Sequence, residues 1–322
     1  MSRLSDFGML VRNENTKIYR RTRTWVLVGI LLAALAFVAG LMKWEEQKRE
    51  GNADWKQQVL LQNEQMKQTM SEKESEVSPA TKSRMEQSVK LNEYYIERDI
   101  NPYENSLWTF VNISSTLIVL VTLLTVVVAA DMVAAEFSWG TIKLLLVGPA
   151  SRTKVLLSKY AATMLFALFL LVLSFAVAFA LGAILEGFDG LTRPLVTIGA
   201  DGNVHEGSML LNVLQNYGFG VVELVMYVTM AFMISASFRS SSMAIAFSLL
   251  FILMGNTLVN LLSNYEWVKY LLFANVNLSQ YVNGTPLRPD MTLIFSIAVL
   301  AGYYLLFQLI AWLMFSKRDV AG

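Results

Sequence analysis

Cysteine is absent from this chain of 322 residues, and histidine occurs once, at His205. Without cysteine the protein forms no disulfide, no thiolate nucleophile and no cysteine-ligated metal site. A single histidine is too few for a histidine-based metal centre. The sequence therefore predicts no metal site, no cofactor in this chain and no catalytic residue set.

Charged residues are also scarce. They make up 16% of the chain, against roughly 25% in average globular proteins, while 55% of the residues are hydrophobic. Long apolar runs with so few charges are typical of a multi-spanning membrane protein. The net charge of +1 is uninformative about partners because the positive charges are segregated, and we expect no nucleic-acid partner. The chain lacks a G-x-x-x-x-G-K-[ST] phosphate loop, so it does not hydrolyse ATP by that route.

Six apolar runs have the length of about 20 residues that is needed to cross a bilayer. They cover residues 25–43, 107–130, 160–185, 217–238, 243–262 and 293–315. The first run is longer than the core of a signal peptide and follows a polar, basic segment, so we expect it to be retained. The predicted fold class is an all-α polytopic membrane protein with six transmembrane helices.

The distribution of lysine and arginine predicts the orientation of these spans. With the N-terminus inside, the cytoplasmic segments contain Arg3, Arg12, Lys17, Arg20, Arg21, Arg23, Lys143, Arg152, Lys154, Lys159, Arg239, Lys317 and Arg318. The two short outer loops contain only Arg193, Lys269 and Arg288. Because basic residues of short loops collect on the cytoplasmic side, both termini are expected in the cytoplasm.

The segment 44–106 then lies outside the membrane. Its apolar residues recur at spacings of four or seven on both sides of Pro79, which predicts an extracellular pair of antiparallel helices joined there. This hairpin is either a solvated spacer or a docking site or gate. Residues 186–216 are expected to form an outer loop. Residues 263–292, with Trp and Tyr side chains and interruptions by Asn, Gly and Pro, favour interfacial or re-entrant helices.

The N-terminal residues 1–24 place apolar side chains on one side of a helix and basic residues around them. This pattern favours an amphipathic helix lying in the inner membrane interface, and a disordered basic tail is the alternative. Residues 316–322 form the expected cytoplasmic tail.

One predicted span carries a polar stripe. Asn212, Asn216, Gly220, Glu223 and Tyr227 recur at spacings of three and four, so they share one helix face. Glu223 is the only carboxylate well inside a predicted span, where an ionised group costs about 2.5–3.5 kcal/mol. The stripe is therefore expected to face the bundle or a wet cavity. Glu223 is either a structural, protonated carboxyl or part of a translocation surface that meets a cation or a proton.

A second pair of polar residues lies in the fifth predicted span. Asn256 and Asn260 are four residues apart, on one helix face beside Gly255. Amides in such positions bond across helices for about 0.6–2 kcal/mol each. Contact between helices is the first interpretation, and lining of a translocation pathway is the second.

The segment 131–159 between the second and third spans is too apolar for an ordinary loop. Ile142 and the Leu and Val residues after it would be exposed unless they pack on something. Gly148-Pro149 ends one helix, and Ser151 is placed to cap the next. The segment is either an amphipathic elbow on the bilayer or a short helix that inserts into a groove of a cytoplasmic partner.

The residues of this loop carry a family resemblance. The pattern E-x-x-x-G-T-[apolar]-K-x-L-L, followed by P-x-S-R and K-x-L-L-S-K-Y, resembles the cytoplasmic loop of the type-2 ABC export permeases. The matching positions are Glu136, Gly140, Thr141, Lys143, Leu145, Pro149, Ser151, Arg152, Lys154, Ser158, Lys159 and Tyr160. The co-linear spans extend the resemblance over the chain. The large outer insertion is most similar to the sodium-export and bacitracin- or lantibiotic-resistance groups.

The resemblance implies the permease subunit of an exporter in a bacterial plasma membrane, and not an enzyme. Two permease subunits, identical or different, would join two separate ATPase subunits that hold ATP and Mg²⁺. The loop helix would seat in a cleft of the ATPase. Arg152 and Lys154 would pair with acidic groups there, and Gly140 and Gly148 would set the turns.

Two rival functions are considered. A membrane-embedded enzyme is disfavoured because the spans hold no paired acid and base and no nucleophile with a base. A non-transporting sensor or accessory subunit, which would bind a peptide or an envelope partner through its outer helices, fits the same architecture.

Overall fold

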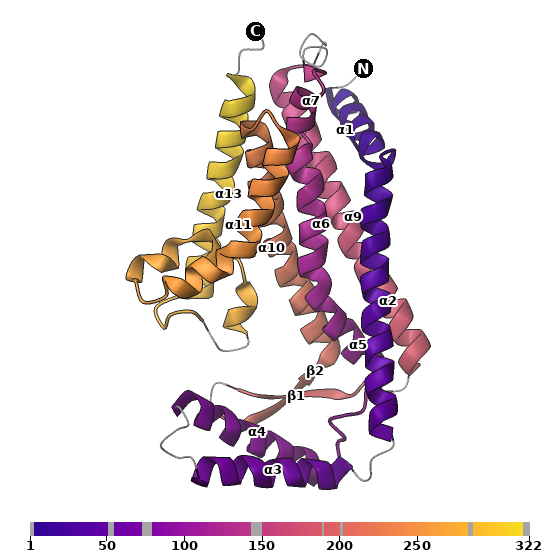
Figure 1. The fold of residues 1–322 in the computed structure, drawn as a ribbon, viewed down its shortest axis with the longest axis vertical. Helices are drawn as coiled ribbons and strands as arrows, with labels where there is room; N and C mark the ends of the chain where they lie inside the picture. Colours follow the sequence, from indigo (N-terminus) through magenta and orange to yellow (C-terminus); the bar gives the residue numbers. More distant parts are fainter. Residues whose placement is uncertain are drawn as a thin grey trace. The chain divides into compact units, whose positions relative to one another are not determined.

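The structure is a computed structural model that describes residues 3–50, 55–72, 79–142, 150–188, 190–199, 202–282 and 286–317. The chain divides into two compact units. Unit 1 comprises Met1–Leu35, Ser115–Val177 and Asn216–Gly322, and unit 2 comprises Ala36–Ser114 and Ala178–Gln215. Figure 1 shows the elements of both units, coloured along the sequence.

Six helical segments are long and apolar enough to cross a membrane, as predicted: Thr22–Lys48, Leu107–Asp131, Arg152–Glu186, Met209–Ser237, Ser241–Leu261 and Leu293–Ser316. The protein is therefore a multi-pass membrane protein. Several of these helices are longer than their apolar runs, because backbone hydrogen bonds continue a helix into polar residues. The third span begins at Arg152, and not at residue 160, and the fourth begins at Met209, and not at residue 217.

The helices of unit 1 come from three parts of the chain. They include α1 (Arg3–Tyr19), α2 (Thr22–Glu50), α6 (Ile118–Asp131), α7 (Ala134–Ser138), α9 (Arg152–Glu186), α10 (Met209–Ser237), α11 (Ser241–Leu261) and α13 (Leu293–Ser316). Of these, α2, α9 and α10 continue into unit 2. The second span is interrupted, with α5 (Leu107–Ser114) and the 3₁₀ turn η1 (Ser115–Leu117) before α6. The N-terminal segment is helical, as expected, and is not a disordered tail.

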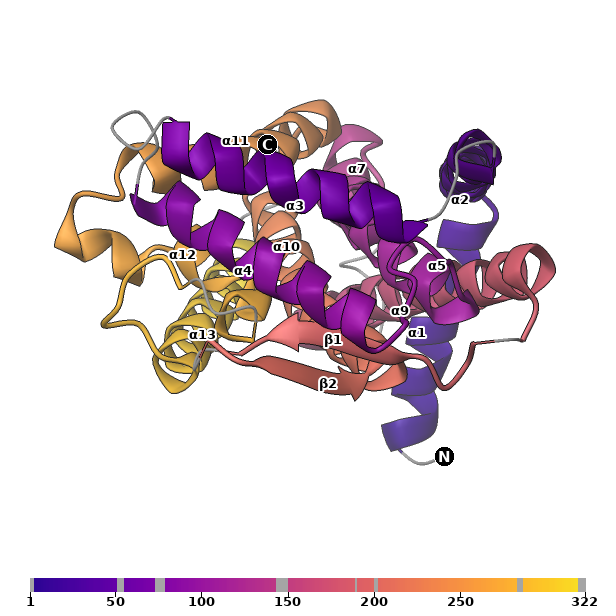
Figure 2. The ribbon, with the colours of Figure 1, turned by 90° about the horizontal axis from the view of Figure 1, so that it is seen from below.

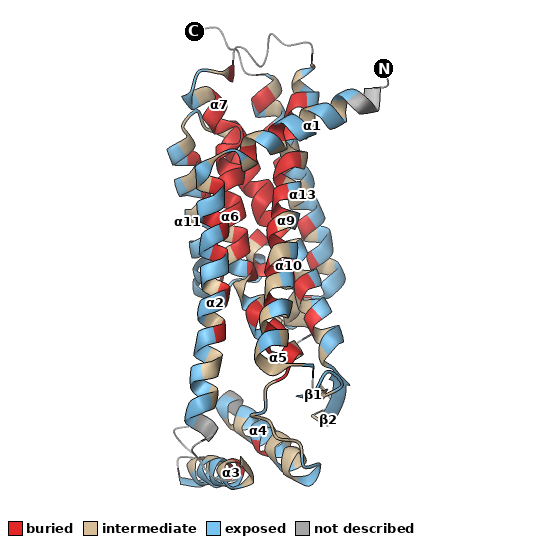
Figure 3. Ribbon diagram, turned by 90° about the vertical axis from the view of Figure 1, so that its right-hand side faces the viewer, coloured by how far each residue is buried: buried red, intermediate tan, exposed pale blue. Residues whose placement is uncertain are grey.

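Buried residues of unit 1 concentrate along α6, α7 and the adjoining parts of α9 and α10 (Figure 3). Helix α6 is apolar on every side, as expected of a helix inside a bundle, and it packs closely on α11. Two glycines allow close approach of neighbouring elements. A Cβ atom at Gly220 would lie 2.7 Å from the Ile118 side chain, and one at Gly255 would lie 2.3 Å from the Phe273 ring.

Three short elements connect α11 to α13: η2 (Glu266–Tyr270), α12 (Leu272–Asn275) and η3 (Leu278–Tyr281). Buried Asn275 organises them, because its amide donates to the carbonyl oxygens of Lys269 and Leu271 at 2.7 and 2.8 Å. Its own carbonyl oxygen accepts from the Ser296 hydroxyl of α13 at 2.6 Å. The short helices expected in residues 263–292 are therefore present. Their depth in a membrane stays a prediction.

Unit 2 contains the predicted helix pair, α3 (Trp55–Glu72) and α4 (Pro79–Glu97). The two helices run antiparallel: Lys56 pairs with Asp99 at 2.6 Å, and farther along Asn92 donates to Asn63 at 2.8 Å. Val59, one of the apolar residues at helical spacing, is fully buried between them. Helix α4 begins at Pro79, where the sequence predicts a break.

The fold is predominantly helical, as predicted, and unit 2 adds one short strand pair that was not predicted. Strand β1 (Pro194–Ile198) pairs antiparallel with β2 (Val204–Ser208), inside the segment expected to be a plain loop. The turn closes through backbone hydrogen bonds that Gly199 makes with Gly202 and Asn203, and Gly202 has a φ of 72°. Two five-residue strands are too short to register in a search for long apolar runs. Figure 2 shows α4 lying between α3 and this strand pair.

Candidate functional site

Three elements of unit 1 meet at a buried lysine. Lys159, near the start of α9, is 1% exposed. Its Nζ lies 2.8 Å from Glu14 Oε2 of α1 and 2.8 Å from Glu136 Oε1 of α7. A buried ammonium group is tolerated only when such partners replace its lost hydration. Glu136 therefore faces its own chain, and it is itself buried.

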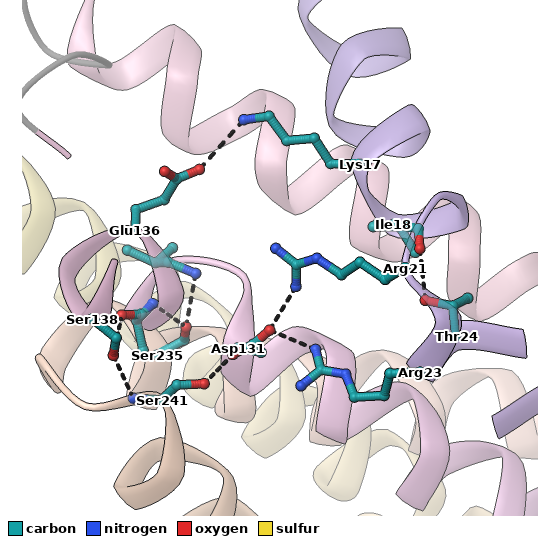
Figure 4. A network of polar contacts seen from close by, with 12 residues as sticks. Lys17, Ile18, Arg21, Arg23, Thr24, Asp131, Glu136, Ser138, Ser235 and Ser241 are labelled. Carbon is teal, nitrogen blue, oxygen red and sulfur yellow. Dashed lines mark hydrogen bonds and ion pairs between the residues drawn. The ribbon is translucent and has the colours of Figure 1, made fainter. Parts of the chain in front are cut away.

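Lys17 and Thr141 complete the charge cluster, which consists of Glu14, Lys17, Glu136, Thr141 and Lys159. Lys17 Nζ lies 2.8 Å from Glu14 Oε1 and 3.3 Å from Glu136 Oε1. The Thr141 hydroxyl donates to the Glu136 carboxylate. Each carboxylate thus contacts both lysines, and the four charges balance. Figure 4 shows Lys17 of α1 reaching toward Glu136 of α7.

The ionisation of the cluster follows from these contacts. Burial by itself would raise the pKa of Glu136, but Lys159, Thr141 and Lys17 outweigh burial and lower that pKa to about 2. Burial would lower the pKa of Lys17, whereas Glu14 and Glu136 raise it above its usual value. Both groups are therefore charged at neutral pH, and electrostatic attraction holds α1, α7 and α9 together.

A second ionic contact lies at the end of α6. Asp131 is 3% exposed, and its Oδ2 lies 2.6 Å from Arg21 Nη1 and 2.5 Å from Arg23 Nη2. The Ser241 hydroxyl, at the start of α11, donates to Asp131 Oδ1. Arg21 also lies 4.7 Å from the centre of the Trp139 ring. One carboxylate thus joins α6 and α11 to the turn after α1 and to the first turn of α2 (Figure 4).

Two serine hydroxyls fasten α7 to its neighbours. Ser235 Oγ of α10 accepts hydrogen bonds of 3.0 Å from the backbone N–H groups of Val133 and Ala134. Such groups at the start of a helix have no partner within the helix. Ser138 Oγ, at the end of α7, accepts from the Ser241 backbone N–H at 3.1 Å. Helix α7 is therefore attached to α10 and α11 as well as to the charge cluster.

The remaining residues of the predicted coupling loop are only partly within the described residues. Lys143, Leu145 and Pro149 lie outside them. Gly140 has a φ of 71°, so it makes the turn expected of it. Ser151 caps α9 as predicted, because its Oγ accepts from the Lys154 backbone N–H at 3.4 Å.

Some of the loop residues bond to the chain itself, whereas others are open to solvent. Glu136 and Thr141, two positions of the loop pattern, are hydrogen-bonded to each other and hold the loop in place. Arg152 donates from Nη1 to the Ser316 carbonyl of α13 at 2.9 Å. Lys154 is exposed at the start of α9. Of these four residues, Lys154 is the one most open to contact with a partner.

The polar stripe on α10 spans the boundary between the units, with Asn212 in unit 2 and the other members in unit 1. Tyr227 is 2% exposed, and its ring stacks on Phe273 with 6.3 Å between ring centres. Asn216 and Glu223 are half-buried. Within the part of the chain that the structure describes, Glu223 has no hydrogen bond or ion pair. The stripe therefore contains one carboxylate that no neighbour neutralises.

The two asparagines of α11 lie on the surface of this chain. Asn256 and Asn260 are both exposed, and in the described ranges neither side chain bonds another helix. The expected contact between helices is thus not found inside one chain. Asn256 instead lines a hollow of about 330 Å³ together with Phe273 and Asn277.

Sequence reasoning missed how the charges pair. The sequence alone predicts no role for Glu14 or Asp131, and it marks Lys159 as a cytoplasmic charge and as a position of the loop pattern. The available signal was that Asp131 and Glu136 directly follow an apolar span, where a carboxylate needs a cation nearby. Which cation pairs with each carboxylate depends on helices that are distant in sequence. Among the described residues, no group of three or more acidic or histidine side chains is suited to a metal ion.

Comparison with known proteins assigns the family. Residues 80–321 match the family described as "Protein of unknown function (DUF2705)". The chain is 40% identical over 320 residues to "Uncharacterized protein YhcI" of Bacillus subtilis (strain 168), covering 97% of this chain and 99% of the relative. It is 32% identical over 214 residues to "Uncharacterized membrane protein YdbK" of the same organism, covering 66% and 82%. Because the family match spans most of the chain, this multi-pass membrane protein belongs to the DUF2705 family.

Proposed function

We propose that this chain is the permease subunit of an ATP-binding cassette exporter in the cell membrane. The observation that supports this most concerns α7, the short helix in the loop that resembles a coupling loop. Both the start and the end of α7 are hydrogen-bonded to neighbouring helices of unit 1. A partner that moves this loop acts on α1 and α9 through the charge cluster, and on α6 and α11 through Asp131. The loop is thus built to transmit a displacement rather than to absorb it.

The proposed mechanism places the α7 end of unit 1 in the cytoplasm. Two ATPase subunits on separate chains bind ATP and Mg²⁺ and close. Their closure displaces the loop between the second and third spans, and the ion pairs carry α6 and α9 with it. Such coupling requires two arrangements of the helices, each favoured by one nucleotide state of the ATPase.

The proposed route for the substrate uses the polar residues of α10 and α11. Glu223 has no neutralising neighbour among the described residues, and the Asn256 and Asn260 amides are exposed. Exposed amides and a lone carboxylate are costly against lipid. We place these three residues toward a second permease subunit, with the substrate path between the two. A carboxylate at this position suits a substrate with a cationic group.

The absence of cysteine permits a sharp test of the loop assignment. In Lys154→Cys, an impermeant maleimide is expected to label inverted vesicles but not intact cells. An ATPase that copurifies with the tagged chain should slow this labelling. The matched control is Lys67→Cys on α3, which should label in intact cells with no effect of the ATPase. Labelling of Lys154→Cys from outside, or equal labelling with and without the ATPase, would overturn the proposal.

A sensor or accessory subunit is the second candidate, and one observation favours it. Leu60 and Leu61 of α3 are 49% and 58% exposed, which leaves an apolar pair on the surface of unit 2. This surface would suit an amphipathic peptide. Transport in vesicles that contain only this chain and its ATPase separates the two functions. ATP-dependent movement of substrate supports the permease, whereas peptide binding to α3 without any transport supports the sensor.

A further inference from the structure

We propose that a groove between α1 and α9 binds an anionic glycerophospholipid of the membrane. All of the groove belongs to unit 1, and the proposal is independent of any transport function. The upper part is a hollow of about 520 Å³ formed by α1 residues that include Arg12 and Asn15, by Arg20 directly after α1, and by Leu165 of α9. A second hollow of about 400 Å³ begins at the same Leu165 and continues along α9 to Ala176.

The upper part of the groove has the chemistry of an anion site. Arg12 and Arg20 are exposed at its two ends and, eight residues apart, are separated by about 12 Å along the helix. Guanidinium groups are suited to phosphate because they donate two parallel hydrogen bonds. Lys17 of the same helix is already committed to the charge cluster. Arg12 and Arg20 are therefore the cations that this hollow offers to an anion.

The upper part of the groove also has polar side chains beside its arginines. Asn15 and Thr16 of α1 line the hollow, and Thr16 is exposed. Amide and hydroxyl groups form hydrogen bonds with the phosphate or glycerol of a lipid headgroup. The upper part thus presents cations for a phosphate and polar groups for the rest of the headgroup.

The lower part of the groove has the chemistry of an acyl-chain site. It is lined by apolar side chains of α9, of which Leu165, Leu168 and Val172 are 46%, 52% and 57% exposed. From Leu165 to Ala176 the helix rises about 16 Å, close to half of a hydrocarbon core of about 30 Å. One acyl chain of one leaflet therefore fits the length of this part.

Aromatic rings connect the two parts. Tyr19 of α1 meets Phe166 and Phe169 of α9 edge to face, with ring centres 5.9 and 5.5 Å apart. Tyr19 lines the upper hollow and Phe169 lines the lower one, so the floor of the groove is continuous. A polar head and an apolar tail joined in this order describe a phospholipid better than a soluble anion.

The experiment compares lipid retention in native mass spectrometry of the detergent-purified chain. Phosphatidylglycerol is expected to remain bound, whereas phosphatidylcholine at the same concentration is not. In the double variant Arg12→Gln/Arg20→Gln, retention should fall about 30-fold, since each basic residue near a lipid surface contributes roughly fivefold in affinity. The control is Arg239→Gln, an exposed arginine of unit 1 outside the groove.

Two further arms identify the source of the binding. Val172→Trp should block the acyl chain and reduce retention while Arg12 and Arg20 are intact. Inorganic phosphate at millimolar concentration should not displace the lipid. The proposal is overturned if phosphate competes fully, if phosphatidylcholine is retained equally, or if the double variant matches Arg239→Gln. It is also overturned if a cysteine placed at Val172 cross-links to a second copy of the chain.

Discussion

At one end of unit 1, charged side chains neutralise one another, whereas three polar side chains of α10 and α11, Glu223, Asn256 and Asn260, have no such partners in the described residues. The charge cluster places two lysines against two glutamates, and Asp131 receives two arginines. Glu223 and the side-chain amide of Asn256 form no hydrogen bond with any residue that the structure describes. Paired charges hold helices in a set arrangement, while unpaired polar groups are kept only where something else contacts them. The first region is thus suited to transmission of movement and the second to contact with a ligand or subunit.

The largest expected effect is the loss of the buried lysine. Lys159→Met leaves the Glu14 and Glu136 carboxylates with Lys17 alone, and removing one member of a buried ion pair costs about 3–5 kcal/mol. Thermal unfolding in detergent should show a large decrease in stability. Lys154→Met, five residues earlier on the same helix and exposed, is the matched control with an effect below about 0.5 kcal/mol.

A double variant sharpens this result. Glu136→Gln in the Lys159→Met background removes one uncompensated carboxylate, so it should restore part of the stability. Equal stability of Lys159→Met and Lys154→Met would show that the cluster does not hold the helices.

The pH dependence of stability is the next largest effect. Since the pKa of Glu136 is lowered from 4.5 to about 2, its ionised form stabilises the fold above pH 4.5. This contribution, on the order of 3 kcal/mol, is lost as the pH falls from 4.5 toward 2. The difference in stability between the wild type and Glu136→Gln should therefore shrink over that interval. A difference that stays constant from pH 7 to pH 2 would contradict the assigned ion pairs.

Close packing of α11 on α12 at Gly255 gives a moderate effect. Gly255→Ala places a Cβ atom 2.3 Å from Phe273 Cδ1, so the ring that stacks on Tyr227 has to move. Overpacking of this kind costs about 1–3 kcal/mol. Gly302→Ala on α13 is the control, because its Cβ meets nothing within 4 Å, and it should be neutral or slightly stabilising. Equal unfolding temperatures for both variants would show that α11 is loosely packed against Phe273.

The smallest expected effect on stability belongs to Glu223. Because this carboxylate has no ion-pair partner in the described ranges, Glu223→Gln should change the free energy of unfolding by less than about 1 kcal/mol. Under the proposed permease function, substrate-dependent ATPase activity of the complex with the ATPase should nevertheless fall, and its pH dependence should change. Unchanged transport at every pH would assign Glu223 to the structural class and remove the distinction between the two regions.

Much of the fold was predictable from local pattern. The six spans, the helical N-terminus, the helix pair that restarts at Pro79 and the cap at Ser151 all follow from apolar runs, helical spacing and turn residues. The strand pair in unit 2 escaped prediction because short strands between glycines leave a weak signal. The helices also exceed their predicted ranges, since hydropathy marks the membrane and not the end of a helix.

The candidate site was less predictable because its members come from distant parts of the chain. The spacing of the loop residues marks Glu136 and Thr141, yet the structure turns Glu136 toward Lys159 and Lys17, and Thr141 toward Glu136. No local pattern distinguishes a carboxylate that faces a partner protein from one that faces its own helices. Both have the same neighbours in sequence, and only burial separates them.

By itself, the sequence determined that this protein crosses a membrane several times, because twenty consecutive apolar residues are stable in few other environments. It also excluded disulfides, thiolate nucleophiles and cysteine-ligated metal sites, since the chain has no cysteine. Only the tertiary structure decided which charges neutralise each other and which polar groups remain without partners. The physical reason is that the energy of a buried charge depends on atoms within a few ångströms, and those atoms are brought together by packing of helices far apart in the chain.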